Sequence, residues 1–147
     1  MLKNTWVVLG ASTAIFVAGF SLGSLREAGS VAQAQAGKHV YEVRTYTTMD
    51  GKLGDLNARF RNHTMRIFNK HGMKSVLYIT PQDAPDSQNT LIYVLEHPSR
   101  EAAKKAWADF AADPEWKKVS EESQVNGKIV SKVVSVFGDP TDYSPMK

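Results

Sequence analysis

The order in which strand-like and helix-like segments alternate is the feature that most constrains the fold of this chain. Residues 39–47 (HVYEVRTYT) alternate β-branched and aromatic residues with charged ones, which is typical of a β-strand. A helix is expected next, with Asp50 as its N-cap and Gly72 as its end. The apolar residues that recur at helical spacing between them are Leu53, Leu56, Phe60, Ile67 and Phe68.

The second half repeats this alternation. Residues 73–80 (MKSVLYIT) and 89–97 (NTLIYVLEH) predict two strands separated by a turn-rich loop. Pro98-Ser99 begins a second helix, and Asp113-Pro114 interrupts it and caps a short third one. After Asn126-Gly127, residues 128–137 (KIVSKVVSVF) predict the last strand.

The element order is therefore βαββαβ, which is the ferredoxin-like motif of the α+β class. Its helices can cover only one face of the sheet, yet the last strand is apolar on both faces, with Val133 and Phe137 on one and Val134 and Val136 on the other. A sheet of this kind favours sheet-to-sheet association of two copies into a dimeric α+β barrel. The alternative is that the C-terminal tail covers the second face.

An uncharged segment precedes this domain, from Trp6 to Leu25. As a helix it would be roughly 30 Å long, which matches the hydrocarbon core of a bilayer. The run AGSVAQAQAG behind it offers the small residues of a signal-peptidase site. We therefore expect residues 1–36 to be a cleaved signal peptide or an uncleaved membrane anchor with a linker, and residues 37–147 to be the domain. Both interpretations place the domain outside the cytoplasm, in the periplasm or another extracytoplasmic space.

Composition excludes several function classes. The chain has no cysteine, so it has neither disulfides nor thiolate metal sites. The net charge is only +3, and no stripe of Lys and Arg is present, so a nucleic-acid partner is not expected. His63 and His71 are eight residues apart on one predicted helix, about 12 Å along its axis, and cannot bind one metal ion alone. We therefore expect no metal site.

Two long runs resemble the NIPSNAP family. They are VYEVRTYTTMDGKLGDLNARFRNHTMRIFNKHGM and NTLIYVLEHPSREAAKKAWADFAADPEWKKVSEES, and the ending PTDYSP resembles the family's C-terminus. The resemblance implies the dimeric α+β barrel fold. That superfamily also includes cofactor-free monooxygenases and haem-handling enzymes, whereas NIPSNAP members mostly lack an assigned activity. No cofactor is expected, with haem as the alternative.

His63 is the first candidate for a functional residue. It lies three residues after Phe60 and four before Ile67, so it is expected on or beside the helix face that packs on the sheet. There it would act as a general base or haem ligand, or be a buried histidine hydrogen-bonded to a group such as Tyr46.

The other candidates lie on the first strand and around the helix break. Glu42 and Arg44 share one side of the strand with Tyr46, and either form ion pairs or line a pocket for an anionic ligand. Aromatic residues near the helix break form core or the wall of an apolar cavity. The predicted ligand-binding residues are Arg44, Tyr46, Phe60, His63, Trp107, Phe110 and Trp116.

Together these patterns favour a non-catalytic homodimer that binds a small hydrophobic ligand or a partner protein. One alternative is a monooxygenase-like or haem-handling enzyme that uses the cleft between helices and sheet. The other is an accessory subunit that docks to a membrane complex through residues 6–25. No nucleophile elbow, phosphate loop or dinucleotide fingerprint is present, so other enzyme classes find no support.

Overall fold

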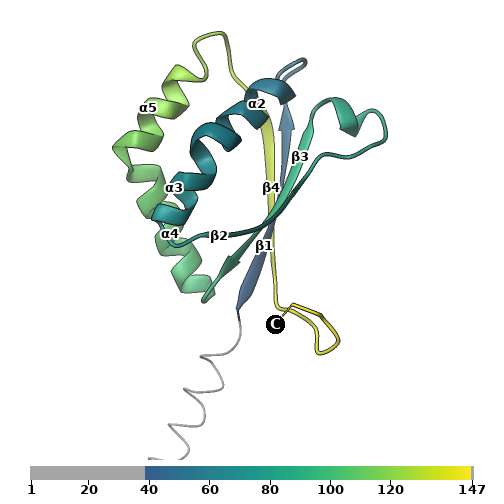
Figure 1. The fold of residues 1–147 in the computed structure, drawn as a ribbon, viewed down its shortest axis with the longest axis vertical. Helices are drawn as coiled ribbons and strands as arrows, with labels where there is room; N and C mark the ends of the chain where they lie inside the picture. The colour runs from purple at the N-terminus through teal and green to yellow at the C-terminus, as the bar shows by residue number, and fades with distance from the viewer. Residues whose placement is uncertain (1–38, 147) are drawn as a thin grey trace, which may run out of the picture. The chain divides into compact units, whose positions relative to one another are not determined.

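A four-stranded antiparallel sheet forms the base of the domain (Figure 1). The computed structural model describes residues 39–146, so the expected N-terminal helix and the boundary at residue 36 lie outside the described part. The strands are β1 (Val40–Thr48), β2 (Lys74–Ile79), β3 (Thr90–His97) and β4 (Val130–Gly138), in the order β2-β3-β1-β4. This confirms the α+β class and all four predicted strands.

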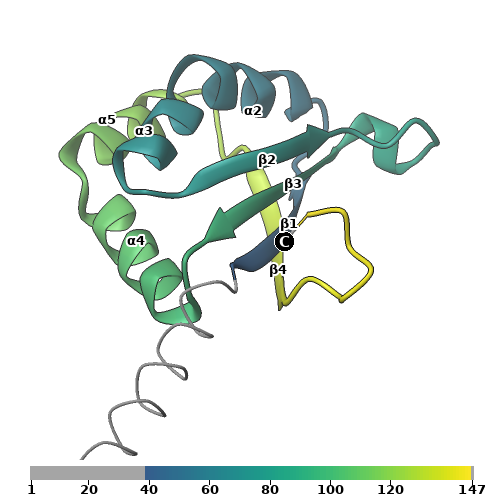
Figure 2. The same cartoon turned by 60° about the horizontal axis from the view of Figure 1, so that its bottom comes forward.

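The helices cover one face of this sheet (Figure 2). The first predicted helix is built from α2 (Leu53–Arg59), the π-helical segment η1 (Phe60–Thr64) and α3 (Met65–Lys70). The second and third are α4 (Arg100–Ala112) and α5 (Pro114–Glu122), and a short 3₁₀ turn, η2 (Asp86–Gln88), lies in the loop before β3. In residues 39–146 no helix is both long and apolar enough to cross a membrane.

The sequence predicts most helix ends correctly. The Ser99 side chain caps α4 by accepting a hydrogen bond from the Ala102 N–H at 3.1 Å, and Asp113 caps α5 in the same way. Gly72 ends α3 with a φ of 73°, a conformation that favours glycine. The expected cap at Asp50 is wrong, because Gly51, with a φ of 71°, makes a turn there and the helix begins at Leu53.

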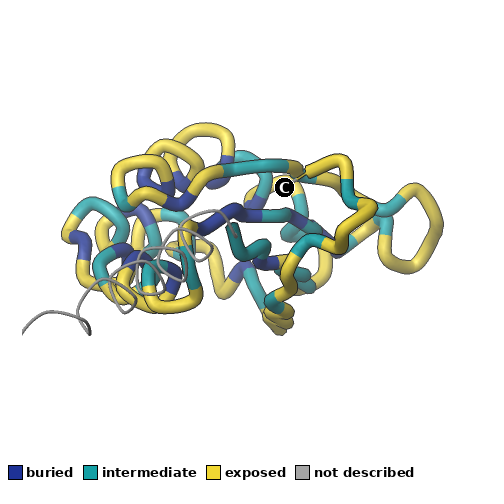
Figure 3. Tube along the Cα trace, turned by 90° about the horizontal axis from the view of Figure 1, so that it is seen from below, coloured by how far each residue is buried: buried dark blue, intermediate teal, exposed yellow. Residues whose placement is uncertain are grey.

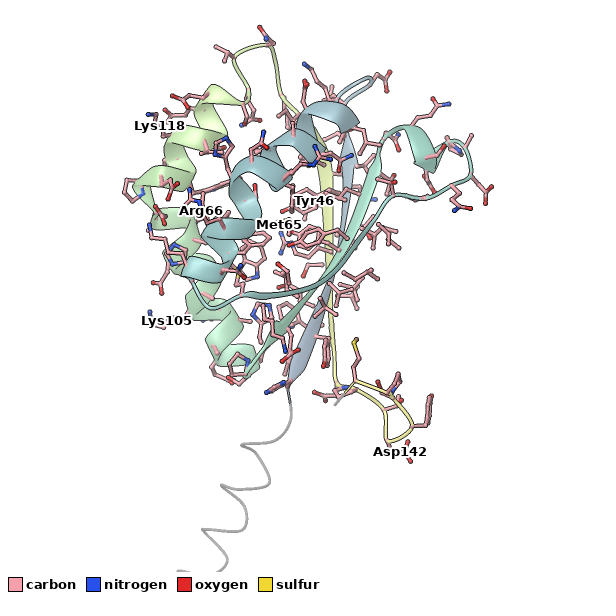
Figure 4. All side chains as sticks on the ribbon, in the orientation of Figure 1. Tyr46, Met65, Arg66, Lys105, Lys118 and Asp142 are labelled. Atoms are coloured by element: carbon pink, nitrogen blue, oxygen red, sulfur yellow. The ribbon has the colours of Figure 1, made fainter. Side chains whose placement is uncertain are left out.

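The core lies between the sheet and the helices (Figure 3). Its centre is a group of aromatic rings in edge-on and tilted contact, in which Phe60 and Phe68 from the first helix meet Tyr93 of β3. Tyr46 of β1 points into the same layer, towards the helices (Figure 4). The other sheet face is left uncovered, and Val136 on that face is 58% exposed. β4, at the sheet edge, also keeps Val133 of its helix-side face 44% exposed.

Candidate functional site

A buried carboxylate, Glu42, organises the helix-side surface of β1. Its side chain is 1% exposed, and four donors surround it. One oxygen, Oε1, accepts hydrogen bonds from Arg44 Nη1 and Ser135 Oγ, both at 2.7 Å. The other, Oε2, accepts one from Trp107 Nε1 at 2.7 Å and lies 3.1 Å from His97 Nε2. Strands β1, β3 and β4 and helix α4 therefore meet at one carboxylate.

These contacts determine the charge state of Glu42. Burial by itself raises the pKa of a carboxyl group, but the hydrogen bonds from His97, Ser135, Trp107 and Arg44 outweigh it and lower the pKa of Glu42 to about 2. Glu42 is thus an anion at neutral pH. Burial by itself lowers the pKa of Arg44, but charge interactions with Tyr46 and Tyr93 and the hydrogen bond to Glu42 outweigh it and raise this pKa above its usual value.

A groove of about 460 Å³ opens beside this network, between α4 and the end of β4. Trp107 lies on its wall with the Arg44 guanidinium carbon 4.1 Å from the ring centroid, a cation–π contact. Arg100 lies over the ring of Phe137 in the same way, at 3.4 Å. Arg44 is already paired with Glu42, so the free charges of this groove are on exposed side chains of α4.

A second pocket, of about 220 Å³, lies between β1, β4 and the helices. Its aromatic walls come from β1 and from the helical segments η1, α3, α4 and α5, and they are Tyr46, Phe60, Phe68, Phe110 and Trp116. Phe110 and Trp116 pack with their ring centroids 4.4 Å apart across the break between α4 and α5. The helix break at Asp113-Pro114 therefore shapes one wall of this pocket, which we call the aromatic pocket.

Arg59 lies at the border of the aromatic pocket and an outer groove of about 340 Å³. It is 7% exposed, its guanidinium carbon is 5.4 Å from the centroid of the Trp116 ring, and Nη1 donates to Ser123 Oγ at 3.3 Å. Its Nε atom is buried without a hydrogen-bond partner. No carboxylate within residues 39–146 forms an ion pair with it.

The expected position of His63 is wrong. His63 is exposed and lines the outer groove, not the face that packs on the sheet. The physical reason is the π-helical segment η1, whose wider turn brings Thr64, instead of His63, into line with Phe60. Thr64 is 1% exposed and is the buried residue of that turn. A role for His63 as a base stays a prediction, now for the outer groove.

The structure groups the other predicted residues in two places. Tyr46, Phe60, Phe110 and Trp116 line the aromatic pocket, whereas Arg44 and Trp107 line the groove beside Glu42. Tyr46 connects the two, because its hydroxyl accepts a hydrogen bond from Arg44 Nη2 at 3.3 Å. In residues 39–146 no three His, Asp or Glu side chains are grouped so that they could hold a metal ion.

Sequence reasoning missed two features of this site. Arg59 is not among the residues predicted for the site, although it is one helical turn from Leu56 and Phe60 is its neighbour. The part of His97 and Ser135 in the Glu42 network was also missed. The strand register could have indicated that His97 and Ser135 contact Glu42. Ser135 pairs with Arg44 across β1 and β4, and His97 lies near Glu42 at the end of β3.

Comparison with known proteins identifies relatives of the whole described domain. The NIPSNAP family model matches residues 41–145. A NIPSNAP family protein of unknown function from Agrobacterium tumefaciens superposes with a TM-score of 0.65 at 19% identity, covering 74% of this chain and 94% of that one. A NIPSNAP-like domain protein from Burkholderia xenovorans gives 0.63 at 16%, covering 73% and 89%.

A more distant similarity extends to an enzyme. A monooxygenase of Streptomyces coelicolor, solved in complex with the ligand nanaomycin D, has a TM-score of 0.50 and 16% identity, with 76% of this chain and 93% of that one covered. At this identity the likeness shows a shared fold. None of the curated proteins matches the chain. The family match spans the four strands and all the helices described above, and the chain therefore belongs to the NIPSNAP family.

Proposed function

We propose that this NIPSNAP domain binds a small organic molecule with an apolar body in the aromatic pocket. The observation that carries the proposal is the pocket itself, about 220 Å³ between sheet and helices, walled by aromatic rings. An apolar cavity of about 150 Å³ in a protein core is large enough for benzene, so this space suits a ligand of one or two rings. Polar groups at its edge, among them Thr64, Ser120 and Gln124, would orient such a ligand.

The pocket has an entrance because the helices do not cover β4. Val133, on the helix-side face of that edge strand, lines the pocket and is 44% exposed. A ligand would enter over Val133 without any strand or helix having to unfold. Replacement of Val133 by a large side chain therefore blocks the pocket while leaving the core unchanged.

Binding can be tested with indole, an uncharged ring molecule, by isothermal titration calorimetry on the full-length protein. We expect indole to bind the wild type and to bind the Val133→Trp variant at least about tenfold more weakly, since the new ring fills the entrance. A matched control is Tyr143→Ala, which removes an aromatic side chain that is 84% exposed in the tail. Equal binding to wild type and Val133→Trp would contradict the proposal, and so would the absence of binding at millimolar indole.

We further propose that two copies associate through the uncovered sheet face. The exposed apolar side chains of that face come from all the strands except β3, and the most exposed are Val43, Leu77, Ile79, Val134 and Val136. They stay exposed although residues 139–146 of the tail are described, which argues against the alternative that the tail covers them. A contiguous apolar face of this kind is typical of an interface.

A second candidate function is that of a cofactor-free oxygenase. The observation that favours it is the Tyr46 hydroxyl, which Arg44 holds by a hydrogen bond at the wall of the aromatic pocket. A positioned phenol beside an apolar pocket can exchange a proton with an oxygen atom of a bound ligand. The fold shared with a Streptomyces monooxygenase is in keeping with this candidate. Dioxygen consumption with a phenolic substrate, lost in Tyr46→Phe, would support it, and no consumption would remove it.

Haem does not fit the described residues around His63. The groove there is lined mainly by polar and charged side chains, including Asp55, Asn62 and Glu122. A porphyrin needs a flat apolar cleft beside its axial ligand. The histidines nearest the apolar core are already engaged, since His97 lies against Glu42 and His71 against Asp113.

We also propose, from the sequence alone, that the domain is exported from the cytoplasm. The uncharged segment 6–25 and the small-residue run behind it favour a domain that acts outside the cytoplasm, either released or held at the membrane. If the segment is retained, the alternative of an accessory subunit docked through it stays open.

A further inference from the structure

Arg59 is a buried cation that the described protein leaves without an anion. Its side chain is almost fully buried, and only Ser123 accepts a hydrogen bond from it. Moving a guanidinium out of water costs several kcal/mol unless an anion and hydrogen bonds replace the lost hydration. Burial correspondingly lowers the pKa of Arg59. Its Nε atom has no hydrogen-bond partner, so the described protein does not by itself replace the hydration of this guanidinium.

A second arginine, Arg44 in the neighbouring groove beside Glu42, has the partners expected of a structural arginine. Arg44 donates to the Glu42 carboxylate at 2.7 Å and to the Tyr46 hydroxyl at 3.3 Å. Its charge is neutralised on its own strand. Arg59 lines the aromatic pocket and Arg44 lines the neighbouring groove, and of the two only Arg44 has a carboxylate partner among residues 39–146.

The carboxylates nearest to Arg59 are directed elsewhere. Asp55 and Glu122 both line the outer groove with Arg59. Asp55 forms its ion pair with Lys52 at 2.9 Å, and Glu122 forms its pair with Lys118 at 3.8 Å. In the aromatic pocket, the other polar groups that line the wall with Arg59 are neutral, such as Thr64 and Gln124. A ligand in that pocket would meet one unneutralised guanidinium beside aromatic walls.

We propose that the ligand of the aromatic pocket is a small organic acid, whose carboxylate pairs with Arg59 and whose apolar body lies among the aromatic rings. The inference rests on the proposed function of the pocket. A carboxylate suits the planar guanidinium because it can accept two parallel hydrogen bonds. One cation balances one negative charge, which favours a monocarboxylate over a phosphate, because a phosphate dianion would bring a second charge into a site without a second cation. The volume of about 220 Å³ limits the body to one or two rings or a short branched chain.

The test compares acids with amides of the same shape. The probes are benzoate and benzamide, 3-phenylpropionate and 3-phenylpropanamide, and hexanoate and hexanamide, titrated into the full-length protein by calorimetry at pH 7. We expect at least one acid to bind roughly tenfold or more tightly than its amide, since a charged hydrogen-bonded pair is lost in the amide. The Arg59→Gln variant should abolish this preference. Arg59→Lys should keep part of it, because lysine retains the positive charge but cannot donate two parallel hydrogen bonds as the planar guanidinium does.

A matched control lies two residues away. Arg61 lies on η1, the π-helical segment that directly follows Arg59 in the same helix, and it is exposed, so Arg61→Gln removes the same charge from the same helix without touching the pocket. It should leave the acid preference unchanged, and circular dichroism should show that all three variants keep the wild-type fold.

The possible results separate the two proposals. Equal binding of acids and amides to the wild type would overturn the carboxylate inference and leave the apolar pocket standing. A preference that persists in folded Arg59→Gln would also overturn it, by placing the carboxylate elsewhere. No binding of indole or of any probe at millimolar concentration would overturn the proposed function itself.

Discussion

Replacement of Glu42 by Gln gives a direct measure of the buried network on β1. Gln has nearly the same shape, but it carries no charge, and one of its two terminal atoms becomes an N–H donor in place of an acceptor. Two of the four surrounding groups then lose their acceptor, and the partly buried Arg44 is left without its anion. The variant therefore tests the charge of Glu42 and not its volume.

The pKa of Glu42 gives the size of the effect. A fall from the ordinary value of 4.5 to about 2 means that the folded state favours the ionised carboxyl group by about 3 kcal/mol. We expect Glu42→Gln to lower the free energy of unfolding at pH 7 by about that amount, which is a large share of the roughly 5–15 kcal/mol typical of a domain.

The pH dependence has a definite sign. Because the pKa of Glu42 is depressed in the folded state, its stabilising effect is complete above pH 4.5 and is lost as the pH falls towards 2. The gap between wild type and Glu42→Gln should therefore be constant from neutral pH down to pH 4.5, and then close.

Urea denaturation followed by circular dichroism, at several pH values between 7 and 2.5, measures this gap. The control is Glu121→Gln, an exposed glutamate on α5 for which little change is expected at any pH. A gap below about 1 kcal/mol at pH 7, or one that is as wide at pH 2.5 as at pH 7, would refute the assignment of Glu42 as a stabilising buried anion.

Further outcomes follow from other parts of the domain. Asp113→Ala should lower Tm by about 5 °C, because it removes the N-cap of α5, whereas Asp113→Asn should keep most of that cap. Val136→Lys places a charge on the uncovered sheet face, so sedimentation velocity should find a dimer in the wild type and a monomer in the variant; a monomeric wild type would contradict the proposed interface. Arg59→Met should raise the unfolding free energy of the ligand-free protein by about 1 kcal/mol, measured in urea, and a loss of stability would mean that Arg59 has a structural partner. Intact mass of the protein from native membrane and soluble fractions should show either loss of residues 1–36 or a full-length chain in the membrane; a full-length chain in the cytosol would contradict export.

The elements of this fold could be predicted because local signals agree with tertiary packing. Asp113-Pro114 illustrates this, since Asp caps a helix and Pro suits its first turn whatever lies nearby. The same signal predicted the aromatic group around the break, and Trp116 and Phe110 do pack there. The N-cap predicted at Asp50 is wrong because local signals there are ambiguous. An Asp-Gly pair suits a tight turn as well as a helix cap, and only the surrounding backbone decides between the two.

The position of His63 could not be predicted from helical spacing. Helical spacing gives 3.6 residues per turn throughout the helix, whereas η1 contains one wider, π-helical turn. After the π-helical segment the spacing resumes, so Ile67 and Phe68 are buried as expected while His63 is not. A pattern of apolar residues is insensitive to such a shift when the residue it brings inward, here Thr64, is small and polar.

Glu42 and Arg59 show where sequence reasoning about charge ends. The alternation of β1 gave the side on which Glu42 and Arg44 lie, and it left open whether they form an ion pair or line a pocket. The structure divides these two roles between two arginines, because Glu42 neutralises Arg44, and Arg59 borders the aromatic pocket with its charge unbalanced. Whether a charged side chain stabilises or destabilises the domain depends on its partners, and these are seen only in the structure. A carboxylate bound in the aromatic pocket would balance the charge of Arg59 in the way that Glu42 balances the charge of Arg44.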